Sequence, residues 1–171
     1  MSDYGSDLST QHNLFPAILA GLNVITIFSV GMNNQTMGVG FWDAVFVLIG
    51  TYLAFKFITY LSQAHEHKES RISPKFRSSF SREGIYAKIR HPVGAGLIYL
   101  NIGCVLLFRS LALIPVVPVF FALWFILAKY QDNELTMKFG EEYRAYIQSS
   151  GMFRGKGDVG QRLEGSGYGM H

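Results

Sequence analysis

Two long apolar blocks open the chain, at residues 14–32 and 41–61, and the second is interrupted only by Asp43 near its start and Lys56 near its end. A hydrocarbon core of about 30 Å needs roughly 20 residues of α-helix to cross it. The segment 33–40 between the blocks is polar and contains glycine, as is typical of a short turn. The pattern therefore predicts two antiparallel transmembrane helices.

A second pair of apolar blocks, at residues 93–108 and 111–130, is separated by a two-residue polar turn. This spacing predicts a helical hairpin. The first arm has sixteen residues, or roughly 24 Å of helix, and is short for a straight crossing. Gly96 and Gly103 lie on one face of it, and small residues allow helices to approach closely in a membrane. We therefore expect an all-α membrane protein with four transmembrane helices, the last two forming a hairpin.

The chain leaves the apolar blocks in an amphipathic segment that precedes a glycine-rich tail. Apolar and aromatic residues recur there at positions i, i+4, i+8 and i+11, namely Leu135, Phe139, Tyr143 and Tyr146. This spacing predicts an amphipathic helix on the cytosolic side, lying against the membrane or a ligand, with its pattern interrupted at Gly140. Residues 154–171 have no core-forming pattern. The predicted organisation is a single transmembrane domain at 1–153 followed by a tail at 154–171.

Basic residues are distributed unevenly. No Lys or Arg precedes Lys56, seven lie in the segment 68–90, and six lie between Lys129 and the C-terminus, within a net charge of +3. Short loops rich in Lys and Arg stay on the cytoplasmic side of a membrane. We therefore expect a multi-pass integral membrane protein whose 62–90 loop and both termini face the cytoplasm or an equivalent matrix. The lipid bilayer is the expected partner, and no nucleic-acid partner is expected.

The sequence favours neither a metal site nor a disulfide. His65 and His67 are two residues apart, so on a helix they point to different sides, and Glu69 is the i+4 neighbour of His65. Cys104 is the single cysteine and cannot form an intrachain disulfide.

Candidate chemistry is concentrated where the basic loop meets the third apolar block, within residues 84–103. Arg90 and His91 are expected at the boundary between water and lipid. Pro92, which lacks an N–H, suits the first turn of the helix that follows. Basic side chains commonly extend from helix ends toward the membrane surface, but a second set of residues further along the chain favours a functional interpretation.

Residues 83–153 contain EGIYAKIRHPVGAG, then the predicted hairpin, then ELTMKFGEEYRAYIQ. Gly-x-Tyr before Arg-His-Pro, a Gly four residues after that Pro, and Leu-x3-Phe-Gly-x2-Tyr-x2-Tyr resemble the isoprenylcysteine carboxyl methyltransferase and phospholipid methyltransferase family of integral membrane enzymes. The resemblance implies a methyltransferase-like core at 83–153. It also implies a cytosol-facing S-adenosylmethionine site and a methyl acceptor that enters from the bilayer, either a prenylcysteine carboxylate or an amine headgroup.

Carried over position by position, the resemblance makes Arg90 and His91 the catalytic candidates. The cofactor-binding candidates are Tyr86, His91, Gly96, Gln131, Asp132, Tyr143 and Tyr146. Methyl transfer is an in-line displacement, so an enzyme mainly aligns the two reactants and excludes water. An Arg can pair with a carboxylate of cofactor or substrate, and a His can take the proton of an amine acceptor.

Two departures from the family pattern leave a second interpretation open. Gly94 stands where the family usually has Tyr, and Gln131 and Asp132 stand where it tends to have two Glu. The alternative is a catalytically silent accessory subunit of a larger membrane complex, which contacts other membrane-protein subunits through its two tails. A nicotinamide site like that of sterol reductases shares a similar C-terminal pattern, but the chain is short for it.

Overall fold

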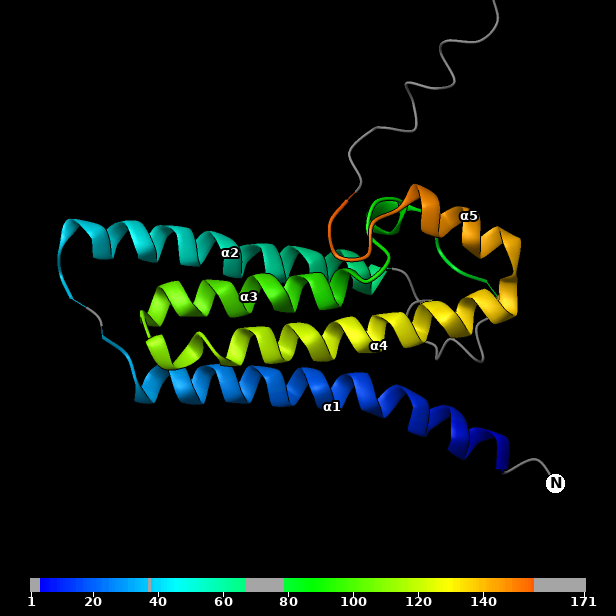
Figure 1. The fold of residues 1–171 in the computed structure, drawn as a ribbon, viewed down its shortest axis with the longest axis horizontal. Helices are drawn as coiled ribbons and strands as arrows, with labels where there is room; N and C mark the ends of the chain where they lie inside the picture. Colours follow the sequence, from blue (N-terminus) through cyan, green and yellow to red (C-terminus); the bar gives the residue numbers. More distant parts are fainter. Residues whose placement is uncertain (1–3, 37, 67–78, 156–171) are drawn as a thin grey trace, which may run out of the picture.

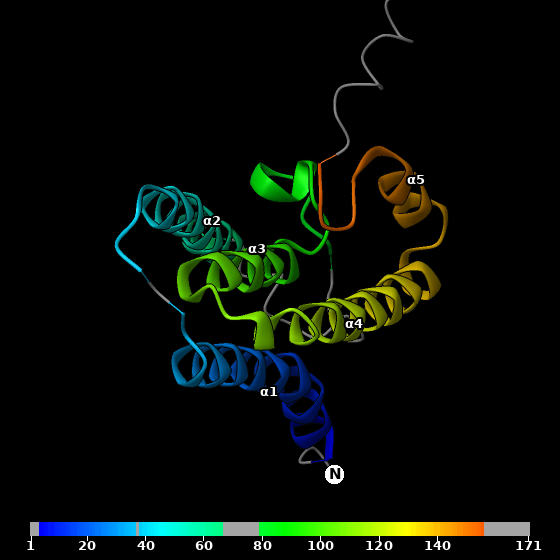
Figure 2. The same ribbon diagram turned by 60° about the vertical axis from the view of Figure 1, so that its left-hand side comes forward.

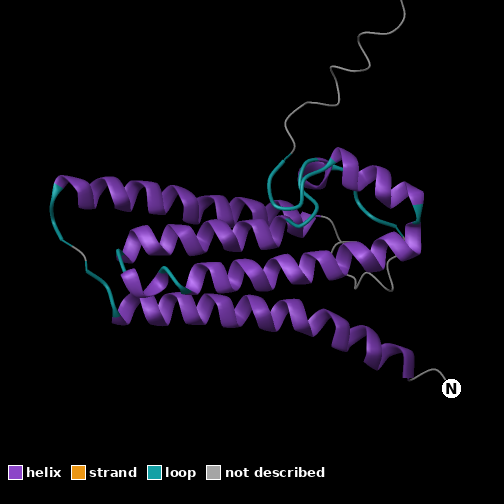
Figure 3. Ribbon diagram, in the orientation of Figure 1, coloured by secondary structure: helices purple, strands orange, loops and turns teal. Residues whose placement is uncertain are grey.

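The computed structural model describes residues 4–36, 38–66 and 79–155, with side chains from Leu14 onward. His67, most of the basic loop and the tail from residue 156 lie outside the described residues. The described elements are α1 (Tyr4–Asn33), α2 (Phe41–Glu66), η3 (Gly84–Ala87), α3 (Pro92–Phe108), η4 (Leu111–Leu113), α4 (Val116–Phe139) and α5 (Glu141–Ser149). As Figure 3 shows, every regular element in this part of the chain is helical.

Within the described residues, three segments have the length and composition of membrane-spanning helices: Leu14–Asn33, Phe41–Glu66 and Leu111–Phe139. Large apolar side chains on their outer faces are exposed, as they are in proteins that contact lipid. The prediction of a multi-pass, all-helical membrane protein is confirmed at this level. The remaining apolar helix, α3, has 17 residues and spans about 26 Å at 1.5 Å per residue.

The four long helices run side by side, with α3 in the centre (Figures 1 and 2). Helix α2 packs along one side of α3, and α1 and α4 contact its other sides. Leu97 and Cys104 of α3 are almost fully buried. Surrounded by protein on most sides, α3 depends less on lipid contact than its neighbours do.

Glycines bring α2 and α3 into close contact. A Cβ placed on Gly103 would lie 2.9 Å from the Gly50 carbonyl oxygen, and one on Gly50 would lie 2.8 Å from the Gly103 carbonyl oxygen. At Gly96 a Cβ would lie 3.2 Å from the Phe57 ring and 3.3 Å from Tyr60 Cβ. The small-residue face predicted from the sequence therefore packs on α2 and not on α4, the other arm of the hairpin.

A buried polar contact joins three of the helices. Asn23 of α1 donates to Asn101 Oδ1 of α3 at 3.0 Å, and Trp124 Nε1 of α4 donates to Asn23 Oδ1 at 3.4 Å. The two asparagines are almost completely buried. Such interhelical bonds contribute about 0.6 kcal/mol each in membranes, so this contact sets the register of α1 and α4 against α3 more than it adds stability.

The end of the bundle at the 33–40 turn is closed by an ionic contact. Arg109 ends α3 in the left-handed region, at φ 46°, and its guanidinium pairs with Asp43 at the start of α2. Arg109 also donates to the Thr36 carbonyl oxygen, and the Thr36 hydroxyl donates back to the Arg109 carbonyl oxygen at 2.6 Å. This contact ties the α1–α2 turn to the predicted hairpin turn.

At the opposite end, the segment predicted as one amphipathic helix is divided between α4 and α5. Helix α4 continues to Phe139, and Gly140 turns the chain at φ 58° and ψ −130°. This backbone conformation favours glycine over residues with a Cβ. The corner folds α5 back, so that Leu135 of α4 and Tyr143 and Tyr146 of α5 share one buried cluster. The sequence spacing identified the residues of this cluster but not the bend between them.

We predict that Gly103→Ala lowers the free energy of unfolding by about 1–3 kcal/mol, because the added methyl group would overlap the α2 backbone. Gly21→Ala is the matched control, since nothing lies within 4 Å of a Cβ placed there. Detergent-solubilised variants would be compared by thermal unfolding. An equal midpoint for Gly103→Ala and Gly21→Ala would contradict the close α2–α3 packing.

Candidate functional site

The chain before α3 and the chain after α5 pair through their backbones. Ile89 and Gly151 form an isolated parallel bridge. Arg90 N donates to the Gly151 carbonyl oxygen at 2.9 Å, His91 N donates to the Met152 carbonyl oxygen at 3.1 Å, and Gly151 N donates to the Lys88 carbonyl oxygen at 2.9 Å. This pairing places Arg90 and His91 beneath α5 and next to α4.

Arg90 joins three separate elements. Its side chain is only 7% exposed and lies 3.3 Å from Asp132 of α4, through both Nε and Nη2. Nη1 donates to the carbonyl oxygens of Ile147, at 3.1 Å, and Ser150, at 2.6 Å. With these contacts the guanidinium neutralises the buried carboxylate and satisfies carbonyl groups at the end of α5, which otherwise lack intrahelical partners.

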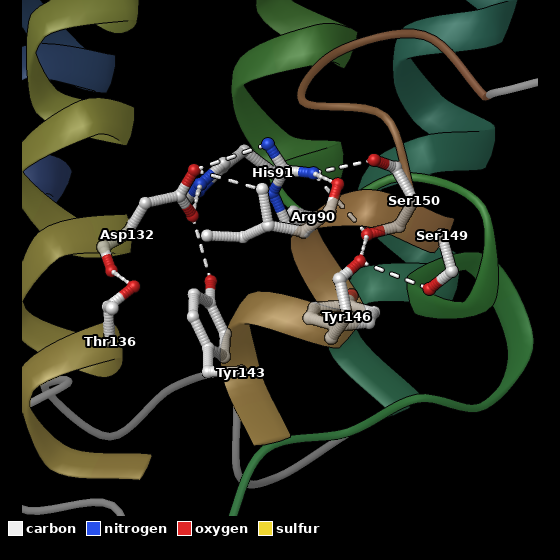
Figure 4. A network of polar contacts seen from close by, with 9 residues as sticks. Arg90, His91, Asp132, Thr136, Tyr143, Tyr146, Ser149 and Ser150 are labelled. Carbon is white, nitrogen blue, oxygen red and sulfur yellow. Dashed lines mark hydrogen bonds and ion pairs between the residues drawn. The ribbon is translucent and has the colours of Figure 1, made fainter. Parts of the chain in front are cut away.

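Asp132 is the common acceptor of the network (Figure 4). Its Oδ1 lies 2.9 Å from His91 Nε2 and accepts from the Tyr143 hydroxyl at 2.8 Å. Because an ionised carboxylate only accepts hydrogen bonds, we assign the ring hydrogen of His91 to Nε2. The imidazole is thereby held in one orientation, with Nδ1 as its unprotonated nitrogen in the neutral ring.

The two α5 tyrosines act as hydrogen-bond donors. Burial raises the pKa of Tyr146 to about 12. The pKa of Tyr143 is also raised above its usual range, mainly by burial and secondly by the negative charge of Asp132. Both phenols therefore keep their hydrogens near neutral pH. The Tyr146 hydroxyl donates to the Tyr86 carbonyl oxygen at 2.6 Å, which fixes η3 against α5.

These residues border a cavity of about 310 Å³ at the end of the bundle nearest α5. Helix α1 contributes Pro16, Ala17 and Ala20, and α2 contributes Leu61, Ala64 and His65. Six aromatic side chains line it: Phe80, Tyr86, Trp124, Tyr143, Tyr146 and Phe153. The cavity thus combines an apolar wall from α1 and α2 with a polar and aromatic wall from α4, α5 and the 84–91 loop.

Most of the residues singled out in the sequence gather here. Tyr86, Arg90, His91, Gln131, Tyr143 and Tyr146 line the cavity. Asp132 lies behind this lining and binds three of its members. Gly96 does not line the cavity, because the side on which a Cβ would project faces Phe57 and Tyr60 of α2.

Several lining residues were not identified from the sequence as part of the site. Phe153 was noted only as the end of the family-like segment, and His65 only as a metal candidate. Pro16 of α1 and Trp124 of α4 lie within uniform apolar blocks, where no local signal distinguishes a cavity wall from a lipid-facing surface. Among the described residues, no three His, Cys, Asp or Glu side chains are grouped to hold a metal ion.

No protein-family model matches the chain, and no curated protein or solved structure matches it significantly. The methyltransferase interpretation therefore depends on the motifs in residues 83–153 and on the geometry of this cavity.

We predict that Asp132→Asn lowers the free energy of unfolding by about 3 kcal/mol, because Arg90 would be left buried without its counter-charge. The control is Glu142→Gln, which removes the acid of the Arg82–Glu142 pair, whose side chains are 46% and 65% exposed. That change should cost less than about 1 kcal/mol. Equal losses in a denaturant titration would show that the Asp132 network does not stabilise the fold.

Proposed function

We propose that this protein is an integral membrane methyltransferase that uses S-adenosylmethionine and acts on a lipid-phase acceptor. The observation that carries the proposal is the cavity, in which an oriented histidine and six aromatic rings face apolar residues of two membrane-type helices. A polar reactant and a lipid could meet in such a place with water excluded.

The residues present suit this cofactor. Aromatic faces attract cations, and a sulfonium is a cation; Phe80, Tyr86 and the two α5 tyrosines would surround it, with the Gln131 amide as a polar contact. A cavity of about 310 Å³ lies at the lower end of the range for small-molecule sites. When bound, the cofactor would supply a methyl group to the acceptor's oxygen or nitrogen. As the new bond to the methyl carbon forms, the carbon–sulfur bond breaks, and its electron pair stays on the sulfur, which becomes neutral.

His91 is the residue suited to proton chemistry. Asp132 holds Nε2 and its hydrogen, so Nδ1 of the neutral ring can accept a proton from an amine acceptor. A prenylcysteine carboxylate would carry no proton to remove and would need only alignment. Arg90 serves as a positioning residue in either case, because its contacts hold α4, α5 and the 84–91 loop together.

The finer topology is part of the same proposal. We infer that α3 crosses the membrane as a fourth span, because it lies parallel to the three longer helices and at their centre (Figure 1). The cavity and α5 then lie on the side of the basic loop. By the positive-inside rule this is the cytoplasmic or matrix-equivalent side, where S-adenosylmethionine would be supplied.

A specific observation also favours the catalytically silent subunit. The donors of Arg90 and both carboxylate oxygens of Asp132 are engaged with other groups of the protein itself. A network satisfied internally stabilises a fold whether or not a cofactor binds. Cofactor binding distinguishes the two functions directly.

We predict that the protein in lipid nanodiscs binds S-adenosylmethionine in the micromolar range, about −8 kcal/mol in calorimetry, and that His91→Ala removes this binding. Lys129→Gln is the control, since that exposed side chain lies over the Phe125 ring and outside the cavity lining. Cooperative unfolding would show that the native protein is folded in the sample. If that folded protein binds no S-adenosylmethionine at millimolar concentration, the result would contradict the enzyme proposal and favour the accessory subunit.

We further predict opposite-side labelling of two single cysteines introduced into a Cys104→Ser background. Val39→Cys lies on the 33–40 turn and Arg144→Cys on α5, and both native side chains are exposed. The proposed orientation places the 33–40 turn outside and α5 inside. A membrane-impermeant maleimide should therefore label residue 39 in intact cells, and residue 144 only after permeabilisation. Labelling of both residues from outside would contradict the proposed orientation.

A further inference from the structure

Gly94 and Phe153 fit against each other at the edge of the cavity. A Cβ placed on Gly94 would lie 3.0 Å from Phe153 Cε1 and 3.5 Å from Trp124 Cε3. A larger side chain at 94 would therefore collide with the Phe153 ring. Gly94 is also the position at which the family-like motif would carry a tyrosine. In place of a tyrosine ring on α3, the structure has the ring of Phe153, which follows α5.

Phe153 lies between the cavity and the outer surface of the bundle. Its ring centroid lies 6.3 Å from that of His91, which lines the cavity, and 6.2 Å from that of Phe121. Phe121 is 45% exposed on α4, a helix with the length and composition of a membrane span. Phe153 itself is half-buried, so the ring contacts both the interior and the lipid-facing side.

The backbone just before this ring is held by hydrogen bonds. Residues 151 and 152 are fixed by hydrogen bonds to Lys88, Arg90 and His91. Phe153 is the next residue, and its own N–H and carbonyl groups are absent from this pairing. The hydrogen bonds given above for Arg90 and His91 do not involve the Phe153 side chain, so a change of its rotamer would leave them in place.

On the proposed function, the size of the cavity favours a wall that can move. A space of about 310 Å³ is at the lower limit for one small-molecule ligand, whereas methyl transfer to a lipid needs two reactants at once. A hydrocarbon chain can reach this space only where an apolar part of the lining meets the lipid-facing surface. Phe153, next to Phe121, occupies such a position.

We propose that Phe153 is a lateral gate, and that the hydrocarbon chain of a membrane lipid enters the cavity past it, over Gly94. Closed, the ring separates the cavity from lipid; displaced, it opens a path between α3 and α4 to Trp124. Glycine at 94 leaves the room for the ring. The inference rests on the proposed function for the purpose of the lipid, but access of the chain can be measured without turnover.

The fluorescence of Trp124 can be used to measure whether acyl chains reach this path. It lines the cavity and is 5% exposed, whereas Trp42, the other tryptophan, is 68% exposed. In a Trp42→Phe background, only Trp124 fluoresces as tryptophan. Nanodiscs of phosphatidylcholine brominated in its acyl chains quench a tryptophan that the chains touch. The companion Trp124→Phe protein, which retains Trp42 at the start of α2, gives the quenching of an exposed ring.

With Phe153→Ala in the Trp42→Phe background, quenching of Trp124 should rise from its protected level toward that of Trp42. Phe55→Ala is the matched control, because this phenylalanine of α2 is 64% exposed and lies outside the cavity lining; it should leave the quenching unchanged. Unchanged quenching with Phe153→Ala overturns the gate. If that variant fails to fold, Phe153→Leu replaces it, with an intermediate rise expected and no rise counting against the gate.

A swap tests the geometry. Gly94→Tyr combined with Phe153→Ala returns an aromatic ring to the same space from α3, so quenching should fall back to the level of the parent. Persistent quenching in a folded double variant would show that the Phe153 ring does not close the path over Gly94.

Calorimetry on the same samples separates this inference from the proposed function. Normal S-adenosylmethionine binding by the parent, with Phe153→Ala quenching unchanged, rejects the gate and leaves the enzyme proposal standing. Raised quenching without any cofactor binding supports lipid access and rejects the enzyme.

Discussion

A carboxylate buried at the end of a membrane bundle has to be neutralised where it lies, because moving an unpaired charge out of water costs several kcal/mol. Asp132 meets this requirement with Arg90, His91 and Tyr143, which come from two elements other than its own helix. The loop before α3, the end of α4 and helix α5 must therefore converge on one point. The polar wall of the cavity is a consequence of that convergence.

The rest of the bundle is arranged so that this end can remain hollow. Packing of α3 on α2 is close because Gly50 and Gly103 let the two backbones meet, and the Arg109–Asp43 ion pair closes the opposite end. Helix α1 contacts α3 and α4 and supplies Pro16 to the cavity wall. Close packing along the centre and the ion pair at one end leave the cavity and its aromatic border as the region suited to binding.

The segment after α5 combines two roles. Its first residues pair with the backbone of Arg90 and His91, and the next residue, Phe153, fills the space over Gly94. A short C-terminal segment thus orients the candidate catalytic histidine and borders the proposed lipid path. At Gly94, where the family that the sequence resembles usually has Tyr, the tertiary structure places the Phe153 ring against the backbone.

The sequence by itself determined where the helices run, because apolar blocks of about 20 residues are stable as helices in lipid. It also determined that Arg90 and His91 precede α3, and that Tyr143 and Tyr146 share an apolar face with Leu135. Only the tertiary structure decided that Gly96 faces α2, that Gly140 turns the chain, and which ring stands over Gly94. The physical reason is that lipid chains are as apolar as a protein core. Hydrophobicity in these blocks therefore cannot distinguish a lipid-facing side chain from one that lines a cavity, and only the packing of the helices against one another makes that distinction.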